Sequence, residues 1–143
     1  TRLIKGSHGI PVMVDTVFRK GEISQSQGLI LPGGMPGAQN LYLHEGLRKS
    51  LIAHNMRETL IAAICAAPIV LGRRDLLNGR RATCYPGFED ELHGAHIVNE
   101  RVCEDGHIIT ARGPGCVNDF AFAIAARFVD SATLSRVKSD MLL

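Results

Sequence analysis

The stretch Thr59-Leu-Ile-Ala-Ala-Ile-Cys65-Ala-Ala-Pro68 decides the fold of this chain. Its apolar residues are typical of a buried β-strand, and the small residues and the proline after Cys65 favour the start of a helix. A cysteine at such a strand-to-helix turn points out of the sheet toward free backbone N–H groups, which favour the thiolate. The stretch therefore predicts a nucleophile elbow with a reactive Cys65, although a buried, unreactive thiol fits the same residues.

The remaining sequence alternates predicted strands with predicted helices. Strands are expected at Ile10–Val14, Gly28–Pro32, Thr59–Ile64 and Arg81–Cys84, and Ile97-Val98 is expected to pair with Ile108–Thr110 around the turn Glu104-Asp105-Gly106. Helices are expected at Asn40–Asn55 with Asn40 as N-cap, at Ala67–Arg74, at Val117–Phe128, and from Ser131, as cap, to Lys138. The alternation predicts an α/β fold with a mainly parallel sheet, in one domain over residues 1–143. The Val117–Phe128 helix is so apolar that it is expected to lie largely buried or at an interface.

Three segments at predicted strand ends carry the candidate site. They are Pro32-Gly33-Gly34, Cys65-Ala66-Ala67 and Arg112-Gly113-Pro114-Gly115. Ligands of open α/β sheets bind at the carboxyl ends of the strands, so neighbouring strands would bring these segments to one pocket. There the backbone N–H groups of Gly34 and Ala66 would bind the oxyanion that forms when Cys65 attacks a carbonyl.

Other residues of these segments are candidates for substrate binding: Gly33, Arg112, Gly113 and Pro114. A plain tight turn at Gly33-Gly34 and a surface position for Arg112 are the open alternatives. Cys84 ends the strand after the elbow, and it is either a resolving thiol for Cys65 or a silent core thiol.

Composition argues against several classes of function. The net charge of +2 over 143 residues, with no lysine- and arginine-rich stripe, argues against a nucleic-acid partner. No apolar run approaches the roughly 20 residues that span a bilayer, so no membrane partner is expected. The four cysteines lack CxxC spacing and are interpreted as free thiols of a reducing, cytoplasmic compartment. His93, His96 and Cys103 match no strong zinc pattern, so neither a metal nor a cofactor is expected.

Four motifs have a combination of residues that is specific to one family. They are Leu29-Ile-Leu-Pro-Gly-Gly34, Gly37-Ala-Gln-Asn40, Ile61-Ala-Ala-Ile-Cys-Ala-Ala-Pro68 and Thr110-Ala-Arg-Gly-Pro-Gly115. Together they resemble the ThiJ/PfpI superfamily, most closely its DJ-one subgroup of protein deglycases and bacterial ThiJ-like relatives. The resemblance implies a flavodoxin-like three-layer sandwich, a homodimer and a redox-sensitive nucleophile at Cys65, with Gly34 and Ala66 as oxyanion donors.

The chain departs from this family pattern at three places. Family members begin with a strand and a helix that carry a glutamic acid hydrogen-bonded to the cysteine. This chain starts downstream of that point, so a separate N-terminal segment is expected to complete the fold. Tyr85 stands where some relatives have a histidine, and a phenol is no base at neutral pH. Ala66 stands where the protease-like branches have a histidine, which argues against peptidase activity.

The resemblance implies two competing functions. The first is a cysteine-dependent deglycase or glutathione-independent glyoxalase, whose partner is a small reactive aldehyde such as methylglyoxal or its protein adduct. The second is an oxidative-stress sensor or redox-regulated chaperone, in which Cys65 is oxidised without turnover.

Overall fold

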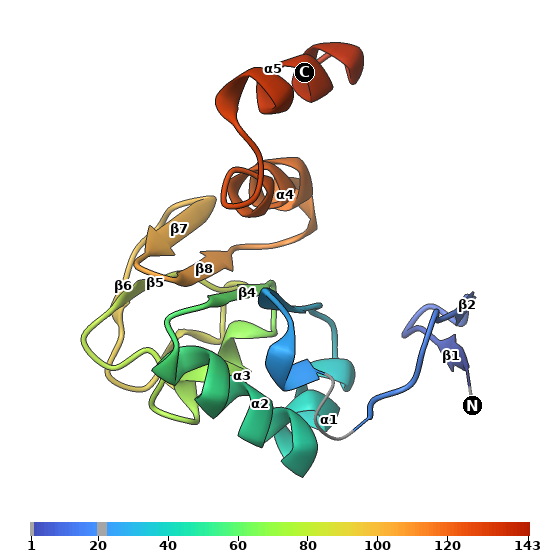
Figure 1. The fold of residues 1–143 in the computed structure, drawn as a ribbon. Helices are drawn as coiled ribbons and strands as arrows, with labels where there is room; N and C mark the ends of the chain where they lie inside the picture. The colour runs from blue at the N-terminus through green and yellow to red at the C-terminus, as the bar shows by residue number, and fades with distance from the viewer. Residues whose placement is uncertain (1, 20–22) are drawn as a thin grey trace.

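A four-stranded sheet lies at the centre of the protein in the computed structural model, which describes residues 2–19 and 23–143 (Figure 1). Its strands, in spatial order, are β3 (Gly28–Leu31), β4 (Leu60–Ile64), β8 (Ile108–Ala111) and β7 (Val102–Asp105). The first three run parallel, and β7 pairs antiparallel with β8. The α/β fold with a mainly parallel sheet is therefore confirmed.

Three helices cover one face of the sheet, which we call the closed face. They are α1 (Gly37–Leu43), α2 (Glu45–Met56) and α3 (Pro68–Gly72), and Figure 1 shows them together on one side. Alternate strand residues point to this side and join the larger core cluster: Leu29, Leu31, Ile61, Ala63 and Ile108. Every residue of α3 is buried, so the segment that follows Cys65 is firmly fixed in this core.

The opposite face, which we call the open face, is covered only in part. α4 (Val117–Ala125) lies on it and α5 (Ser131–Asp140) lies beyond α4 (Figure 1). A smaller cluster forms under α4 from Leu60, Ala62, Ile109, Ala111 and Phe120. Ile30 of β3 points to the same side by the strand alternation and is 55% exposed, so this end of the face is uncovered among the described residues.

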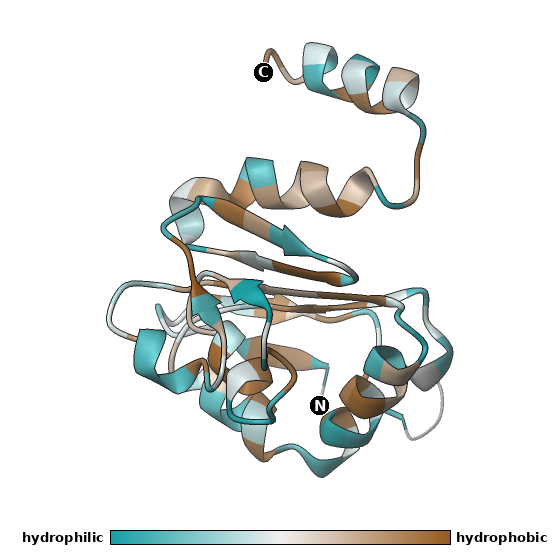
Figure 2. Cartoon of the chain, turned by 90° about the vertical axis from the view of Figure 1, so that its left-hand side faces the viewer, coloured by the Kyte–Doolittle hydropathy of each residue, from teal (hydrophilic) through white to brown (hydrophobic). Residues whose placement is uncertain are grey.

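α4 is strongly apolar, yet most of its residues are not buried. Figure 2 colours much of this helix brown, yet Phe120 is its only buried residue and Val117 is 51% exposed. The helix is therefore not largely buried within the described part of the chain, although such burial is one of the two expected outcomes. The other outcome, an interface, stays a prediction. None of the helices in the described ranges is long and apolar enough to cross a membrane.

Two smaller sheets accompany the central one. The antiparallel hairpin of β1 (Leu3–Lys5) and β2 (Pro11–Met13) lies apart from the main body, and its strand residues are all exposed (Figure 1). β5 (Arg81–Ala82) and β6 (His96–Ile97) form a short parallel pair near β7. Short 3₁₀ turns occupy η1 (Ile23–Gln25), η2 (Glu89–Glu91) and η3 (Pro114–Cys116).

The single helix predicted at Asn40–Asn55 is wrong. α1 starts at Gly37, so Asn40 lies inside it and is not an N-cap. The chain becomes extended at His44, with a ψ of 103°, and then restarts as α2. The His44 imidazole accepts a hydrogen bond from the Leu47 N–H (3.0 Å), which satisfies a donor that the first turn of α2 leaves unpaired.

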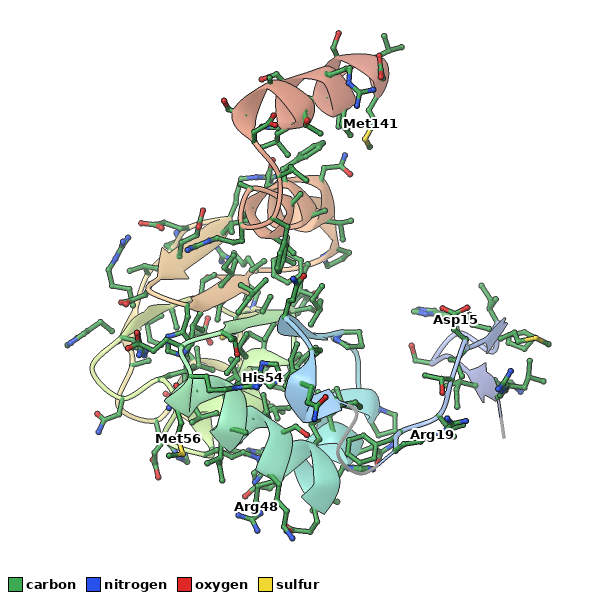
Figure 3. All side chains as sticks on the ribbon, in the orientation of Figure 1. Asp15, Arg19, Arg48, His54, Met56 and Met141 are labelled. Atoms are coloured by element: carbon green, nitrogen blue, oxygen red, sulfur yellow. The ribbon has the colours of Figure 1, made fainter. Side chains whose placement is uncertain are left out.

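His54 anchors α2 to the rest of the closed face. Figure 3 shows it pointing into the molecule, whereas Arg48 and Met56 of the same helix point outward. The buried ring contacts Thr59 Oγ1 (2.7 Å) beside β4 and Ile23 O (3.0 Å) in η1. His54 therefore has a structural role and is not a candidate base for Cys65.

The strand pairing predicted for Ile108–Thr110 is also wrong. β8 pairs with β7 through the two-residue turn Gly106-His107, in which Gly106 has a φ of +59°. Ile97 pairs instead with Ala82, in the β5–β6 ladder. β7 was not predicted because charged residues occupy half of its length, which weakens the strand pattern.

Asp130, and not the predicted Ser131, caps α5. Its carboxylate accepts a hydrogen bond from the Thr133 N–H (2.7 Å). Both residue types are favourable N-caps, so sequence alone did not separate the two adjacent positions.

Candidate active site

Cys65 occupies a sharp turn between β4 and α3. Its φ of +64° lies in the left-handed region, which a non-glycine residue rarely adopts. The Cys65 N–H donates to Ala111 O (2.9 Å), and the Cys65 carbonyl accepts from the Tyr85 N–H (2.9 Å). The side chain is partly exposed. A strained residue at a strand-to-helix turn, held by backbone bonds on both sides, has the geometry of a nucleophile elbow.

Gly33 packs directly against this turn. A Cβ atom at Gly33 would lie 2.6 Å from Cys65 Cβ and 2.7 Å from the Ile64 carbonyl oxygen. The ends of β3 and β4 meet here because the two strands pair in parallel register. Only glycine permits so close an approach of two backbones. Gly33 therefore has a packing role at the elbow, and its contact with substrate stays a prediction.

Two backbone N–H groups beside Cys65, those of Gly34 and Ala66, have no hydrogen-bond partner among the described residues. The Ala66 nitrogen lies 3.2 Å from the position of a Cβ on Gly33, and Gly34 follows Gly33 directly. Ala66 is only 2% exposed, and an unpaired donor on a buried residue is uncommon, whereas Gly34 is partly exposed. Two unpaired donors beside one nucleophile can stabilise an oxyanion. α3 has only five residues, so its dipole adds little to these donors.

The end of β8 brings the third predicted segment to the same edge of the sheet. Arg112 follows Ala111, whose carbonyl is bonded to the Cys65 N–H. Gly113 is buried, and the Tyr85 ring would lie 3.3 Å from a Cβ placed there. Pro114 is exposed and begins η3. The structure thus gathers the predicted site residues at one edge: Gly33, Gly34, Cys65, Ala66, Arg112, Gly113 and, at the rim, Pro114.

A cavity of about 210 Å³ opens beside this edge. Its polar lining residues are Thr83, Cys84, Glu89, Asn99 and Arg112. The Arg112 guanidinium donates a hydrogen bond to Asn99 Oδ1. The lining contains no histidine within the described part of the chain, so this pocket supplies Cys65 with no imidazole base.

Cys84 is a second thiol near the elbow and is 3% exposed. The pKa of its thiol is raised from the ordinary 9.0 to about 11, mainly by burial and also by the negative charge of Glu89, against the opposing effect of Arg112. A charge on Cys65 also raises the pKa of Cys84, so the two thiols interact. Cys84 is therefore protonated at neutral pH and is a poor attacking thiol, which favours the silent core thiol over the resolving one.

Metal ligands do not gather in the part of the chain that the structure describes. No group of three His, Cys, Asp or Glu side chains there is arranged to hold an ion. His93 and His96 are exposed, whereas Cys103 is buried, with a thiol pKa raised by that burial.

Comparison with known sequences identifies the family. A sequence model of the DJ-1/PfpI family matches residues 1–127. The chain belongs to the DJ-1/PfpI family. The resemblance to the ThiJ/PfpI superfamily that its motifs predict is thereby confirmed.

Several curated relatives are similar over nearly the whole chain. Protein DJ-1 homolog A of Arabidopsis thaliana is 34% identical over 143 residues, which cover 98% of this chain and 36% of the relative. Deglycase PH1704 of Pyrococcus horikoshii is 34% identical over 115 residues, which cover 78% of this chain and 68% of the relative. The chain thus spans only about a third of the length of its plant relatives.

Solved structures of this family have the same fold. A crystal structure of a mutant DJ-1 superfamily protein, STM1931 of Salmonella typhimurium, aligns with a TM-score of 0.91 at 30% identity and covers 99% of this chain and 78% of that chain. Drosophila melanogaster DJ-1beta aligns with a TM-score of 0.90 at 28% identity, over 99% of this chain and 77% of that chain.

Sequence reasoning missed Glu89 and Asn99 as neighbours of the site. Asn99 directly follows the predicted Ile97-Val98 strand, so the strand-end rule that selected Arg112 applied to it as well. Glu89 carries no such signal, because it reaches the cavity from the 3₁₀ turn η2 rather than from a strand end.

Proposed function

We propose that this protein is a cysteine-dependent deglycase or glutathione-independent glyoxalase, which acts on small reactive aldehydes such as methylglyoxal or on their protein adducts. Family membership supports a deglycase-type role, as do relatives named deglycases at 32% and 34% identity. The observation that carries the proposal is the pair of unbonded N–H groups, of Gly34 and Ala66, beside a partly exposed Cys65.

In the proposed reaction the Cys65 thiolate attacks the aldehyde carbon of methylglyoxal and a C–S bond forms. The carbonyl electron pair moves to oxygen, where the Gly34 and Ala66 N–H groups bind the negative charge. Protonation gives a hemithioacetal. Transfer of the proton on the thiol-bearing carbon to the neighbouring carbon, through an enediol, gives a thioester. Water then hydrolyses the thioester to lactate and restores the Cys65 thiol.

The proton transfers need an acid–base group, and we place it outside these 143 residues, on a glutamic acid of a strand–helix segment. One observation supports the strand of that segment, and a second supports its helix. β3 pairs only with β4 among the described residues, and Ile30 is uncovered on the open face. A parallel strand added to the free edge of β3 would end at the same sheet edge as Cys65.

A homodimer and a cytoplasmic location complete the proposal. The hairpin β1–β2 presents exposed apolar side chains, including Leu3, Ile4, Val12 and Met13, which a second copy would cover. Sedimentation velocity checks this directly, since a monomer at micromolar concentration contradicts the dimer. Four free cysteines fit a reducing compartment.

The test of the proposed activity is the Cys65→Ser variant of the whole protein. A serine hydroxyl is far less nucleophilic than a thiolate, so lactate formation from methylglyoxal should fall by at least about 100-fold. Cys116→Ser is the matched control, because it removes a cysteine outside the lining of the cavity. Undiminished turnover by Cys65→Ser would refute the reaction scheme.

A sensor is the second candidate, and one observation favours it. Two free N–H donors bind the oxygens of a cysteine sulfinate as well as they bind an oxyanion, and no histidine base lines the cavity. In this case two equivalents of peroxide oxidise the Cys65 thiolate to the sulfinate and leave two waters. Intact mass after mild peroxide treatment would show two added oxygens at Cys65 before any other cysteine reacts, with no aldehyde turnover.

A further inference from the structure

The cavity beside Cys65 contains one cation that lacks an acidic partner. Six arginines in the described ranges form ion pairs with Asp or Glu: Arg48, Arg73, Arg80, Arg81, Arg101 and Arg127. Arg112 is not among them and has only a neutral partner, the Asn99 side-chain oxygen. A partly buried guanidinium in a cavity, bonded to one neutral oxygen, keeps donors available for an anion.

Further donors surround this guanidinium. Asn99 uses its oxygen to accept from Arg112, so its NH₂ group remains a donor in the same cavity. Thr83, whose backbone N–H is bonded to Thr110 Oγ1 (3.0 Å), adds a hydroxyl to the lining. An arginine fork with neighbouring neutral donors has the chemistry that recognises a carboxylate.

Glu89 lines the same cavity and makes the site selective. None of the ion pairs among the described residues joins Arg112 to Glu89, so the two charges do not neutralise one another directly. Glu89 is held by the Gly87 N–H (2.7 Å). The Glu89 carboxylate repels any anion in this cavity, so Arg112 binds a single carboxylate against that repulsion, whereas a second negative charge would meet the same repulsion with no further cation in the described lining.

The cavity lies next to the elbow, although Cys65 itself is not among its lining residues. Cys84 and Arg112 each lie one residue from a backbone group that is hydrogen-bonded to Cys65. Its volume of about 210 Å³ accommodates a carboxylate and a short carbon chain, given about 30 Å³ for each water in the liquid.

From these features we propose that Arg112 and Asn99 bind the carboxylate of 2-oxoaldehydes that carry an acidic group at their far end. The inference rests on the proposed reaction at Cys65 and names its substrate class: monocarboxylated 2-oxoaldehydes are preferred over neutral ones. Arg112 contributes binding and specificity, and it takes no part in bond making.

Binding is tested without turnover in the Cys65→Ala variant, by calorimetric titration with butanoate and with its neutral amide, butanamide. Butanoate should bind at least about 10-fold more tightly, because a hydrogen bond to a charged group is worth more than one to a neutral group. Arg112→Gln should remove this difference, and Arg48→Gln, on an exposed ion pair of α2, should keep it.

Glu89→Gln should strengthen butanoate binding, a gain that a misfolded variant cannot produce. The inference is overturned if butanoate and butanamide bind with equal affinity. It is also overturned if Arg112→Gln and Glu89→Gln both leave the affinity for butanoate unchanged.

Turnover separates this inference from the proposed function. The specificity ratio compares kcat/KM for 4,5-dioxopentanoate with kcat/KM for methylglyoxal, and Arg112→Gln should lower it on the order of 10- to 100-fold. If neither aldehyde is consumed, the proposed function fails while the butanoate titration still decides the binding site. If methylglyoxal is consumed but the ratio is the same in Arg112→Gln, the carboxylate site alone is refuted.

Discussion

The closed and open faces of the central sheet differ in how far the described helices cover them, and the elbow is built on the better covered face. On the closed face α1, α2 and α3 bury the strand side chains, as at Ile61 (0% exposed). On the open face α4 covers β8, while Ile30 at the β3 end is 55% exposed. The two residues belong to neighbouring strands of one sheet, so their contrast comes from coverage and not from sequence type.

The elbow belongs to the closed face. The larger core cluster includes Ala66, Ala67 and the α3 residues Ile69, Val70 and Leu71. The strained φ of Cys65 is therefore held by well-packed neighbours. A candidate nucleophile is thus positioned by the complete half of the molecule, while the acid–base group we propose would come with whatever covers the other half.

The largest effect should come from filling the space between β3 and the elbow. Gly33→Ala puts a methyl group 2.6 Å from Cys65 Cβ and 2.7 Å from a backbone oxygen, so one of the two strand ends must move. We expect a loss of about 3 kcal/mol in the free energy of unfolding, the upper end for overpacking, and loss of Cys65 reactivity toward iodoacetamide. Denaturant unfolding and alkylation rates measure the two effects.

Gly37→Ala is the matched control for this substitution. A Cβ at Gly37 would meet no atom within 4 Å, and the residue lies in α1, where alanine is the better helix former by up to about 1 kcal/mol. It should be neutral or stabilising. If Gly33→Ala matches Gly37→Ala in its free energy of unfolding and in the alkylation rate of Cys65, the close approach of the two backbones at the elbow contributes neither to stability nor to reactivity.

The next effect compares the two faces directly, through Ile61→Val and Ile30→Val. Removing a buried methylene group at Ile61 should lower the free energy of unfolding by about 1 kcal/mol, whereas the same change at exposed Ile30 should cost less than about 0.5 kcal/mol. In a longer protein that includes the proposed strand–helix segment, the cost at Ile30 should rise to that at Ile61. An Ile30 cost that stays small in the longer protein would mean that the segment does not cover the open face.

These contrasts also explain how far the sequence could predict the structure. β3, β4 and the elbow were predictable because each is a local signal: an apolar run that ends in Pro-Gly-Gly or in Cys-Ala-Ala-Pro. The break at His44 was not, because it depends on one imidazole accepting the Leu47 N–H within a run of helical spacing. β7 was missed because its two charged residues hide the pattern of its apolar ones.

For the site, the sequence indicated which residues lie at strand ends but not how those ends pack. Gly33 was selected as a neighbour of substrate, yet its contact with Cys65 Cβ is visible only once β3 and β4 are paired in register. The same holds for Glu89, whose turn carries no strand-end signal. Through-space packing of separate loops is the part that no local pattern encodes.

The smallest effect compares helix caps on the two sides, at His44 and at Asp130. His44 caps α2, which buries Leu47, Leu51 and His54 in the closed face, so His44→Ala should lower the free energy of unfolding by about 0.5–1 kcal/mol. α5 has no buried residue, so Asp130→Ala should leave global unfolding unchanged and raise amide exchange in α5 alone.

The Asp130 cap also carries a pH signature. The Thr133 N–H holds the pKa of this carboxyl below its ordinary 3.8. A lowered pKa means that the cap is complete above pH 3.8 and is lost as the pH falls through the lower folded value, so the Thr133 amide resonance should move only in that acidic range. If Asp130→Ala lowers the free energy of global unfolding as much as His44→Ala does, α5 is part of the cooperative core. In that case the contrast between the two faces does not hold.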